Sequence, residues 1–313
     1  MEKLVVIAIG GNSLIKDAEH STVFDQYRAC GETSDRIADI VAEGYRVVIT
    51  HGNGPQVGFI LLRSELAKEV LHQVPLDSCG ADTQGAIGYQ ISQTLDNELR
   101  RQGIEKGVVA IVTQTVVDAA DPGFQSPSKP IGPFYSEAAA REHQDKEGWV
   151  MREDAGRGWR RVVASPRPLE IIEEPAIEAL LAKDIIVVAV GGGGIPVIRR
   201  GDGSLQGVGA VIDKDWASCL LAKNLGAEKF ILSTAVDRVA LNFGKPDQRE
   251  IDRMTVAEAH GYLEEGHFPA GSMKPKIEAA IDFLEDGGQE VIITRPDLLE
   301  DAIHGRAGTH IVP

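Results

Sequence analysis

The sequence predicts an α/β fold in which a mainly parallel β-sheet is covered by helices on both faces. Apolar runs rich in β-branched residues alternate along the 313 residues with segments whose apolar residues recur at helical spacing. The apolar runs hold almost no polar residues, which is typical of parallel strands buried on both faces. Because ligands of such sheets bind beyond the carboxyl ends of the strands, the residues that follow each strand are the first candidates for function.

Six segments have the length and composition of buried strands: Leu4–Ile9, Arg46–Thr50, Val108–Thr113, Ile185–Val190, Phe230–Ser233 and Glu290–Thr294. Three helical faces are expected between strands, made by Ile37, Ile40 and Val41, by Ile60, Leu61, Leu66 and Val70, and by Ile277, Ala280, Ile281 and Leu284. A hairpin is expected over Arg199–Leu205, because it contains an Asp-Gly pair. Helices are expected over Trp216–Leu225 and Ile277–Leu284.

The stretch Asp118–Arg161 interrupts this alternation, and we expect no strand within it. It contains a short helical pattern over Glu137–Glu147. Prolines surround Lys129 and fix the backbone that carries this cation. We therefore interpret residues 118–161 as a small protruding subdomain or lid within one domain of residues 1–313, with a solvated insertion as the alternative.

The composition excludes several classes of protein. The chain has 32 Lys and Arg against 47 Asp and Glu, a net charge of −15, so a nucleic-acid partner is not expected. Three cysteines without a C-x-x-C pair argue against a disulfide framework and fit a reducing cytoplasm. The apolar start Leu4–Ile9 lacks the basic region of a signal peptide, and the apolar runs are too short to span a bilayer, so no membrane partner is expected.

Glycine is abundant, with 34 residues, and three predicted strands end in glycine turns. The turns contain Gly10, Gly11 and Asn12, then Gly52, Asn53 and Gly54, and finally Gly191, Gly192, Gly193 and Gly194. Free backbone N–H groups at a strand end, ahead of a helix N-terminus, form a cradle for phosphate. Glycine also makes ordinary tight turns, but three at equivalent places favour an anion site. The P-loop and G-x-G-x-x-G dinucleotide motifs are both absent.

Two lysines stand where helices are expected to begin. Lys214 lies between Asp213 and Asp215, either of which can cap the helix. Lys276 follows a Gly-Ser pair at the start of a later helix. A cation is unfavourable at a helix N-terminus unless an anionic ligand binds there. We therefore expect phosphoryl transfer, with glycine N–H groups and lysines neutralising the moving group and the two aspartates orienting the lysines and helping to hold Mg²⁺.

Eight motifs follow one another along the chain: GGNSL (10–14), HGNGPQVG (51–58), TQGAIGY (83–89), PSKPIGPF (127–134), EDAGRGWRRVV (153–163), GGGGIPV (191–197), VIDKD (211–215) and GHFPAGSMKPKIEAAI (266–281). Together they resemble the carbamate kinases of the amino-acid-kinase superfamily. The resemblance covers essentially the whole chain, and HGNGPQVG and GGGGIPV with VIDKD are its most specific parts.

The resemblance implies a dimeric enzyme with an open αβα sandwich. It implies reversible phosphoryl transfer between ATP and carbamate, giving ADP and carbamoyl phosphate. Mg²⁺ would be the cofactor, held mainly by phosphates, with no metal ligand assigned to the protein. The reaction would make ATP in arginine or related nitrogen catabolism, although purine or allantoin breakdown stays open.

The resemblance also assigns roles to residues. The catalytic set is Lys129, Lys214, Asp215 and Lys276, in which the aspartate organises the lysines. Carbamate and the transferred phosphate would contact Gly10, Gly11, Asn12, Gly52, Asn53, Gly54, Gly191, Gly192, Gly193 and Gly194. The nucleotide would lie on the loop Ser233–Asp237 and the segment Asn242–Lys245, and would contact Ser233, Asp237, Phe243, Lys245, Ser272 and Met273.

Two other classes of function compete with this interpretation. Another small-acid kinase, such as acetylglutamate kinase, would lack the PSKPIGPF segment and need an arginine for its larger carboxylate. A non-catalytic sensor of nucleotide or carbamoyl phosphate would have lost Lys214, Asp215 or Lys276, and all three are present. Carbamate is already an anion, so its attacking oxygen requires no general base.

Overall fold

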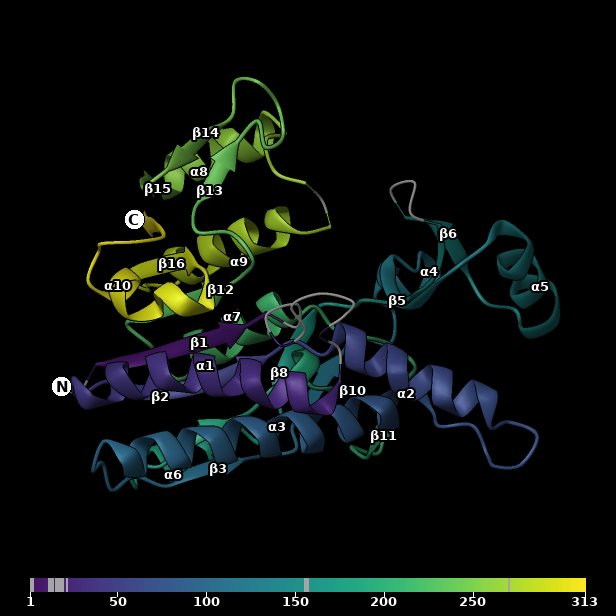
Figure 1. Cartoon of the computed structure of the whole chain (residues 1–313). Coiled ribbons are helices and arrows are strands. Elements are labelled where there is room, and N and C mark those ends of the chain that lie inside the picture. The colour runs from purple at the N-terminus through teal and green to yellow at the C-terminus, as the bar shows by residue number, and fades with distance from the viewer. Residues whose placement is uncertain (1–2, 11–13, 15–19, 21, 155–157, 270) are drawn as a thin grey trace.

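An eight-stranded, mostly parallel sheet runs through the centre of the computed structural model (Figure 1). The structure describes residues 3–10, 14, 20, 22–154, 158–269 and 271–313. The strand order is β15-β17-β16-β12-β1-β2-β9-β3, with bounds Arg253–Thr255, Thr309–Val312, Glu290–Thr294, Lys229–Ser233, Leu4–Ile9, Arg46–His51, Ile186–Val188 and Val108–Ala110. All six predicted strands lie in this sheet, which confirms the predicted α/β class.

The sheet differs from the prediction at its edge and at two strand ends. β15 and β17 have no counterpart in the prediction, and β17 runs antiparallel to β16. β3 and β9 end before Thr113 and Val190, where longer strands are expected. The backbone N–H of Thr113 donates instead to Gln84 Oε1 at 2.7 Å, and its hydroxyl accepts the N–H of Val190 at 3.0 Å. These side-chain bonds replace the strand pairing, so both strands stop early.

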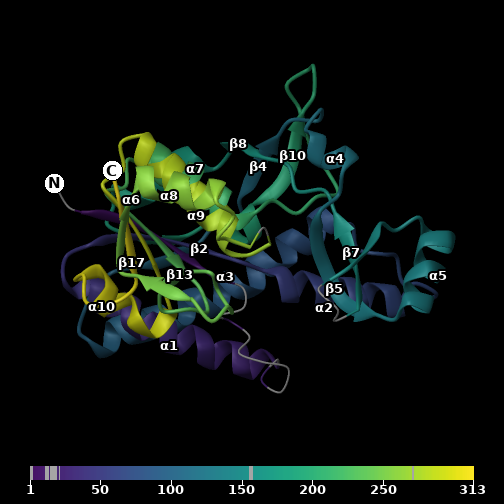
Figure 2. The same cartoon turned by 90° about the horizontal axis from the view of Figure 1, so that it is seen from above.

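Helices cover both faces of the sheet (Figure 2). They are α1 (Val23–Ala42), α2 (Gly54–Leu66), α3 (Leu76–Arg101), α4 (Pro122–Gln125), α5 (Glu137–Glu147), α6 (Glu174–Leu181), α7 (Lys214–Asn224), α8 (Val256–Glu264), α9 (Met273–Glu285) and α10 (Leu299–Ile303), with 3₁₀ turns at Gly191–Gly193 and Pro296–Leu298. Helices α1, α3 and α10 lie on one face, and α7, α8 and α9 lie on the other. Within the described part of the chain, no helix has the length and apolar character of a membrane span.

The core has two apolar layers, one on each face of the sheet. Val5, Ile7 and Ile9 of β1 belong to the layer under α1 and α3, whereas Leu4 and Val6 belong to the layer under α7 and α9. This alternation follows from the two-residue period of a strand. The predicted faces of α1 and α9 are buried as expected.

The helical face predicted after β2, made by Ile60, Leu61, Leu66 and Val70, is wrong at its C-terminal end. Leu66 and Val70 are exposed, because α2 ends at Leu66 and its last turn lies beyond the sheet, on the side of β5 (Figure 1). An apolar core does not extend to this end of the helix.

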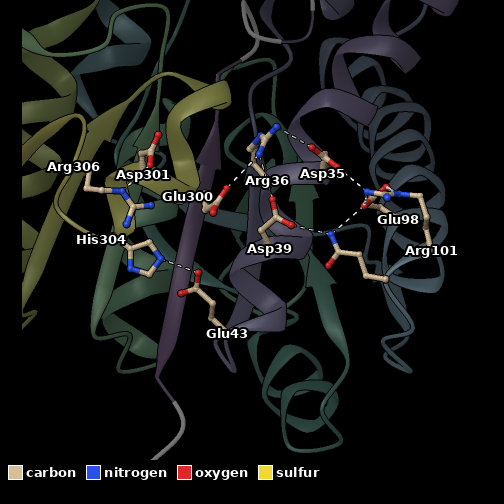
Figure 3. Close-up of polar contacts among 11 residues, drawn as sticks. Asp35, Arg36, Asp39, Glu43, Glu98, Arg101, Glu300, Asp301, His304 and Arg306 are labelled. Carbon is tan, nitrogen blue, oxygen red and sulfur yellow. Dashed lines mark hydrogen bonds and ion pairs between the residues drawn. The ribbon is translucent and has the colours of Figure 1, made fainter.

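Charged side chains join α1 to the helices beside it (Figure 3). Arg36 of α1 contacts Asp39 at 3.4 Å and Glu300 of α10 at 3.3 Å, and Arg101 of α3 reaches Asp35 at 3.3 Å. Exposed pairs of this kind contribute about 0–1 kcal/mol each. Burial of the apolar layers, rather than this network, therefore holds the helices on the sheet.

A second sheet continues from the third glycine turn. Its order is β11-β10-β4-β8, with bounds Leu205–Gly207, Ile195–Arg199, Gln114–Val117 and Pro168–Ile171. β10 and β11 form the predicted hairpin. The turn at residues 191–194 therefore leads into strand β10. The phosphate cradle predicted there requires a helix N-terminus after the turn, and that part of the prediction is wrong. The reason is backbone geometry: Gly192, Gly193 and Gly194 have φ of 68°, 93° and 87°, which turns the chain toward β4.

A third sheet, β5-β7-β6, lies within the segment where no strand is expected, so that expectation is wrong. Its bounds are Lys129–Tyr135, Trp159–Val163 and Met151–Glu153. Among the strands that the structure describes, β5 pairs with β7 and lies at the edge of this sheet, where Pro130 and Pro133 are tolerated. Figure 1 shows this sheet and the predicted helix α5 standing apart from the main sheet, and a short hairpin, β13 (Val239–Leu241) with β14 (Arg249–Ile251), at another extremity.

Candidate active site

The first turns of three helices meet at one cavity of about 240 Å³. Gly54 and Pro55 begin α2, Lys214 and Asp215 begin α7, and Lys276 lies in the first turn of α9. Helix N-termini carry partial positive charge and unsatisfied N–H groups. Three of them facing one cavity make a site for an anion with several charged oxygens.

Lysines from three distant segments line this cavity. Lys214 Nζ donates to Asp215 Oδ1 at 2.5 Å, and Lys276 Nζ donates to Asp215 Oδ2 at 2.7 Å. Lys129 Nζ, from β5, donates to Asp213 Oδ2 at 2.7 Å. The structure thus brings together the four side chains predicted as the catalytic set. With two aspartates against three lysines, this group carries a local charge of +1 within a chain of net charge −15.

Asp215 holds two lysines in one place. Burial alone raises its carboxyl pKa, but Lys214 and Lys276 together lower the pKa well below its usual range. Burial lowers the pKa of Lys214. Burial also opposes the charge of Lys276, but Asp215 outweighs it and raises the pKa of that lysine. The buried carboxylate therefore keeps two ammonium groups in contact with it and sets their direction.

Asp213 connects Lys129 to the start of α7. Its Oδ1 accepts the backbone N–H of Asp215 at 2.9 Å, which makes it the N-cap of the helix. Its Oδ2 binds Lys129. The sequence identifies Asp213 as a possible cap, but its contact with a lysine 84 residues away leaves no sequence signal.

Both of the first two glycine turns contribute residues to the cavity lining. Gly10, Gly52, Asn53 and Gly54 all line it. The Asn53 amide donates to Thr83 Oγ1 at 2.8 Å, which fixes its orientation. The predicted Gly11 and Asn12 lie outside the described residues.

The third glycine turn is explained mostly by packing against the protein itself. A Cβ on Gly191 would lie 2.3 Å from His51 Nε2, and one on Gly194 would lie 1.9 Å from Thr115 Oγ1. A Cβ on Gly193 would lie 2.7 Å from a carbonyl oxygen. Gly192 lines the cavity, but its Cβ would also meet the Asn53 amide, at 2.0 Å. Of the four predicted phosphate contacts, Gly192 alone is part of the cavity lining.

The residues predicted for the nucleotide are spread over a wider area. Ser272 lines the cavity, and Met273 is the first residue of α9 behind it. Ser233 is buried at the end of β12, and Asp237 lies in the loop that follows. Phe243 and Lys245 are exposed between β13 and β14 and are not part of the lining.

Three further residues line the cavity beside the lysines: Thr234 and Ala235, after β12, and Ile131 of β5. Thr234 and Ala235 belong to the loop Ser233–Asp237 that is expected on the nucleotide side, at the end of a buried strand. Ile131 is missing from the predicted site, because an isoleucine gives no sequence signal of a role in binding.

Comparison with known proteins supports the same interpretation. Residues 3–295 match the model of the amino acid kinase family. Carbamate kinase of Thermococcus kodakarensis is 50% identical over 313 residues, which span 99% of each chain. This chain belongs to the carbamate kinases of the amino acid kinase family. The carbamate kinase-like protein YahI of Escherichia coli is also 50% identical, over 100% of this chain and 99% of that protein.

The fold agrees with that of solved carbamate kinases. The structure of carbamate kinase from Giardia lamblia bound to AMP-PNP is 42% identical and superposes with a TM-score of 0.92. The match covers 99% of this chain and 98% of that one. The resemblance and the αβα architecture predicted from the motifs are therefore confirmed.

The carboxylates of this carbamate kinase site are engaged with the protein itself. Both oxygens of Asp215 bind lysines, and those of Asp213 bind Lys129 and a backbone N–H. Among residues 3–10, 14, 20, 22–154, 158–269 and 271–313, no group of three or more His, Cys, Asp or Glu side chains is arranged to hold a metal ion. The donor set therefore fits a metal bound through nucleotide phosphates better than one held by Asp213 and Asp215.

His51 should make the stability of this carbamate kinase sensitive to mild acid. The ring is buried, and burial, opposed by the hydrogen bond to Gly52 and aided by Lys214, lowers its pKa from 6.5 to about 4. Between pH 4 and pH 6.5, His51 therefore binds a proton in the unfolded chain but not in the folded chain. Stability is therefore complete above pH 6.5 and falls by about 3 kcal/mol as pH drops toward 4.

Urea unfolding across this pH interval measures the effect, with His51→Gln as the control because glutamine does not titrate. We expect the wild-type curve to lose stability more steeply than the control. Equal slopes in the two proteins would show that His51 is not held neutral by burial.

Proposed function

We propose that this protein transfers a phosphoryl group reversibly between ATP and carbamate, giving ADP and carbamoyl phosphate. The observation that carries the proposal is the convergence of Lys129, Lys214 and Lys276 on one cavity, two of them held by the buried Asp215. Phosphoryl transfer requires in-line positioning and neutralisation of the charge on the moving group. Fixed ammonium groups and three helix N-termini supply that neutralisation.

In the forward direction, a carbamate oxygen forms a bond to the γ-phosphorus of ATP while the bond from that phosphorus to the ADP oxygen breaks. The attacking oxygen carries no proton, so the buried, neutral His51 is not required as a base. Lys214 and Lys276 would contact the transferring oxygens, and Asp215 would act as a positioning residue. Lys129 would approach from β5, as its contact with Asp213 at 2.7 Å places it at the same cavity.

We further propose that ATP enters with Mg²⁺, which would neutralise phosphate charge when bound. Ser272, in the cavity lining, would contact phosphate, whereas Ser233, Asp237, Met273, Phe243 and Lys245 would lie toward the rest of the nucleotide. Gly10, Gly52, Asn53, Gly54 and Gly192 would contact carbamate or the transferred phosphate.

A homodimer, a cytoplasmic location and use of the reaction to make ATP in nitrogen catabolism belong to the same proposal. The family resemblance supports the dimer and the direction. The location is supported by Cys30, Cys79 and Cys219, which are buried free thiols.

A comparison of phosphoryl donors tests the function. The purified protein is given Mg·ADP with either carbamoyl phosphate or acetyl phosphate, and ATP formation is followed with luciferase. We expect ATP to form faster from carbamoyl phosphate, because the methyl group of acetyl phosphate cannot donate hydrogen bonds to a polar lining. A faster rate with acetyl phosphate, or failure of ATP to form from carbamoyl phosphate, would contradict the proposal.

A further inference from the structure

A larger cavity, of about 360 Å³, lies beside the active site between α2 and the β5-β7-β6 sheet. Ile131 of β5 belongs to the linings of both cavities. The residues that define the active-site chemistry, Lys129, Lys214 and Lys276, are absent from the larger lining. The larger cavity is therefore a separate space on the other side of Ile131.

Arg161 gives this cavity a cation without a direct ion pair, although the carboxylates of Glu65 and Glu147 lie near enough to favour its charged form. Its guanidinium lies over the Trp149 ring, 4.5 Å from the centroid, and makes neither an ion pair nor a hydrogen bond with the described residues. Burial lowers its pKa, although the guanidinium remains charged at neutral pH. A half-buried cation that stacks on an aromatic ring, with its N–H groups unpaired, is suited to binding a carboxylate.

The other polar groups of the lining refine this chemistry. The hydroxyl of Tyr135 also has no hydrogen bond to the described residues, and the Tyr135 ring lies 6.2 Å from that of Trp149. Glu65 is already engaged, through one oxygen with Lys68 and through the other with Gln73 at 3.0 Å. Because Glu65 is already paired with Lys68, one further carboxylate can pair with Arg161, whereas a dianion would add a second negative charge beside Glu65.

Much of the rest of the lining is apolar, although Ser64 and Gln73 also belong to it. Leu61 and Leu62 of α2, Val74 and Leu76 after that helix, and Ile131 surround the space next to the cation. An apolar wall with a few convergent polar groups is typical of a small-molecule site.

We propose that this cavity is a second ligand site, which binds a small organic monocarboxylate. The carboxylate pairs with Arg161 and Tyr135, and the apolar body lies against Leu61 and Ile131. The site is independent of the proposed reaction, because none of the three active-site lysines takes part in it.

Phenylacetate is a suitable probe, and its neutral analogue phenylacetamide is the matched control. The protein, labelled with 5-fluorotryptophan, gives fluorine NMR signals from Trp149, Trp159 and Trp216, its three tryptophans. We expect phenylacetate to shift the Trp149 signal saturably and phenylacetamide to bind at least tenfold more weakly. A shift confined to Trp216, which follows Asp215 on α7, would place the carboxylate at the lysines and overturn the proposal.

Two variants decide whether Arg161 and the cavity are responsible. Arg161→Met should abolish the Trp149 shift, whereas Arg141→Met should keep it, because Arg141 is exposed on α5 and pairs with Glu137 outside the cavity. Leu62→Phe narrows the cavity without changing the cation, so it should also abolish the Trp149 shift. This variant provides the test if Arg161→Met does not fold. Retention of the shift in Leu62→Phe, or no Trp149 shift in the wild type, would refute the site.

Discussion

Replacing Lys214 by methionine should lower kcat by about 10²–10³ while the protein stays folded. Lys214 is mostly buried at the cavity, with 13% of its side chain exposed, and it donates to Asp215, so its ammonium is fixed before substrate arrives. Methionine removes the charge and keeps most of the volume. Asp215 retains its contact with Lys276 at 2.7 Å, so no buried carboxylate is left without a counter-ion.

Lys274→Met is the matched control for this variant. Lys274 lies two residues from Lys276 on α9, but its side chain is half-exposed, and within the described part of the chain its ion pair is with Glu278, at 3.9 Å. Steady-state phosphoryl transfer should therefore be unchanged in the control. A kcat within a few-fold of wild type for Lys214→Met would remove this lysine from the mechanism.

Replacing Asp215 by asparagine should cost both activity and stability. The carboxylate is 5% exposed and binds two lysines, so its loss leaves two mostly buried ammonium groups without the carboxylate that contacts them. Breaking a buried ion pair from one side costs about 3–5 kcal/mol of unfolding free energy. We also expect kcat to fall by at least about 10², because neither lysine keeps its direction.

A double variant separates these two effects. In Asp215→Asn with Lys214→Met, one unpaired cation is gone, so urea unfolding should show part of the stability restored. Activity should not return. Asp286→Asn, which alters an exposed carboxylate 3.7 Å from Lys223, should behave like wild type. If the single and double variants were equally stable, the two charges would not be coupled through Asp215.

The sequence predicts the main sheet well because its strands are buried on both faces. Leu4–Ile9 is apolar at every position, and this is the signal of a central parallel strand. Strand β17, next to the edge strand β15, is short and antiparallel to β16, and β5 contains two prolines, so neither carries that signal. Such strands form because a neighbouring strand is available, which a local pattern does not record.

Residues of the site, like the strands, are predictable where they leave a local signal in the sequence. Lys214 and Lys276 are predictable because a cation at a helix start is locally unfavourable and requires a reason. Asp213 as the partner of Lys129 is not predictable, since 84 residues separate them. The run Gly191–Gly194 is misleading in isolation: packing against His51, Asn53 and Thr115 demands glycine there, whether or not phosphate binds.

The central claim is that phosphoryl transfer between carbamoyl phosphate and ADP takes place at the lysines gathered around Asp215. Phosphorus NMR of carbamoyl phosphate with Mg·ADP follows donor loss and ATP gain together, in wild type and in folded Lys214→Met at equal concentration. The account predicts that ATP signals grow with wild type as carbamoyl phosphate disappears, and about 10²–10³ times more slowly with the variant. Carbamoyl phosphate that decays at the rate of the protein-free control without giving ATP, or equal ATP formation by the two proteins, would contradict it.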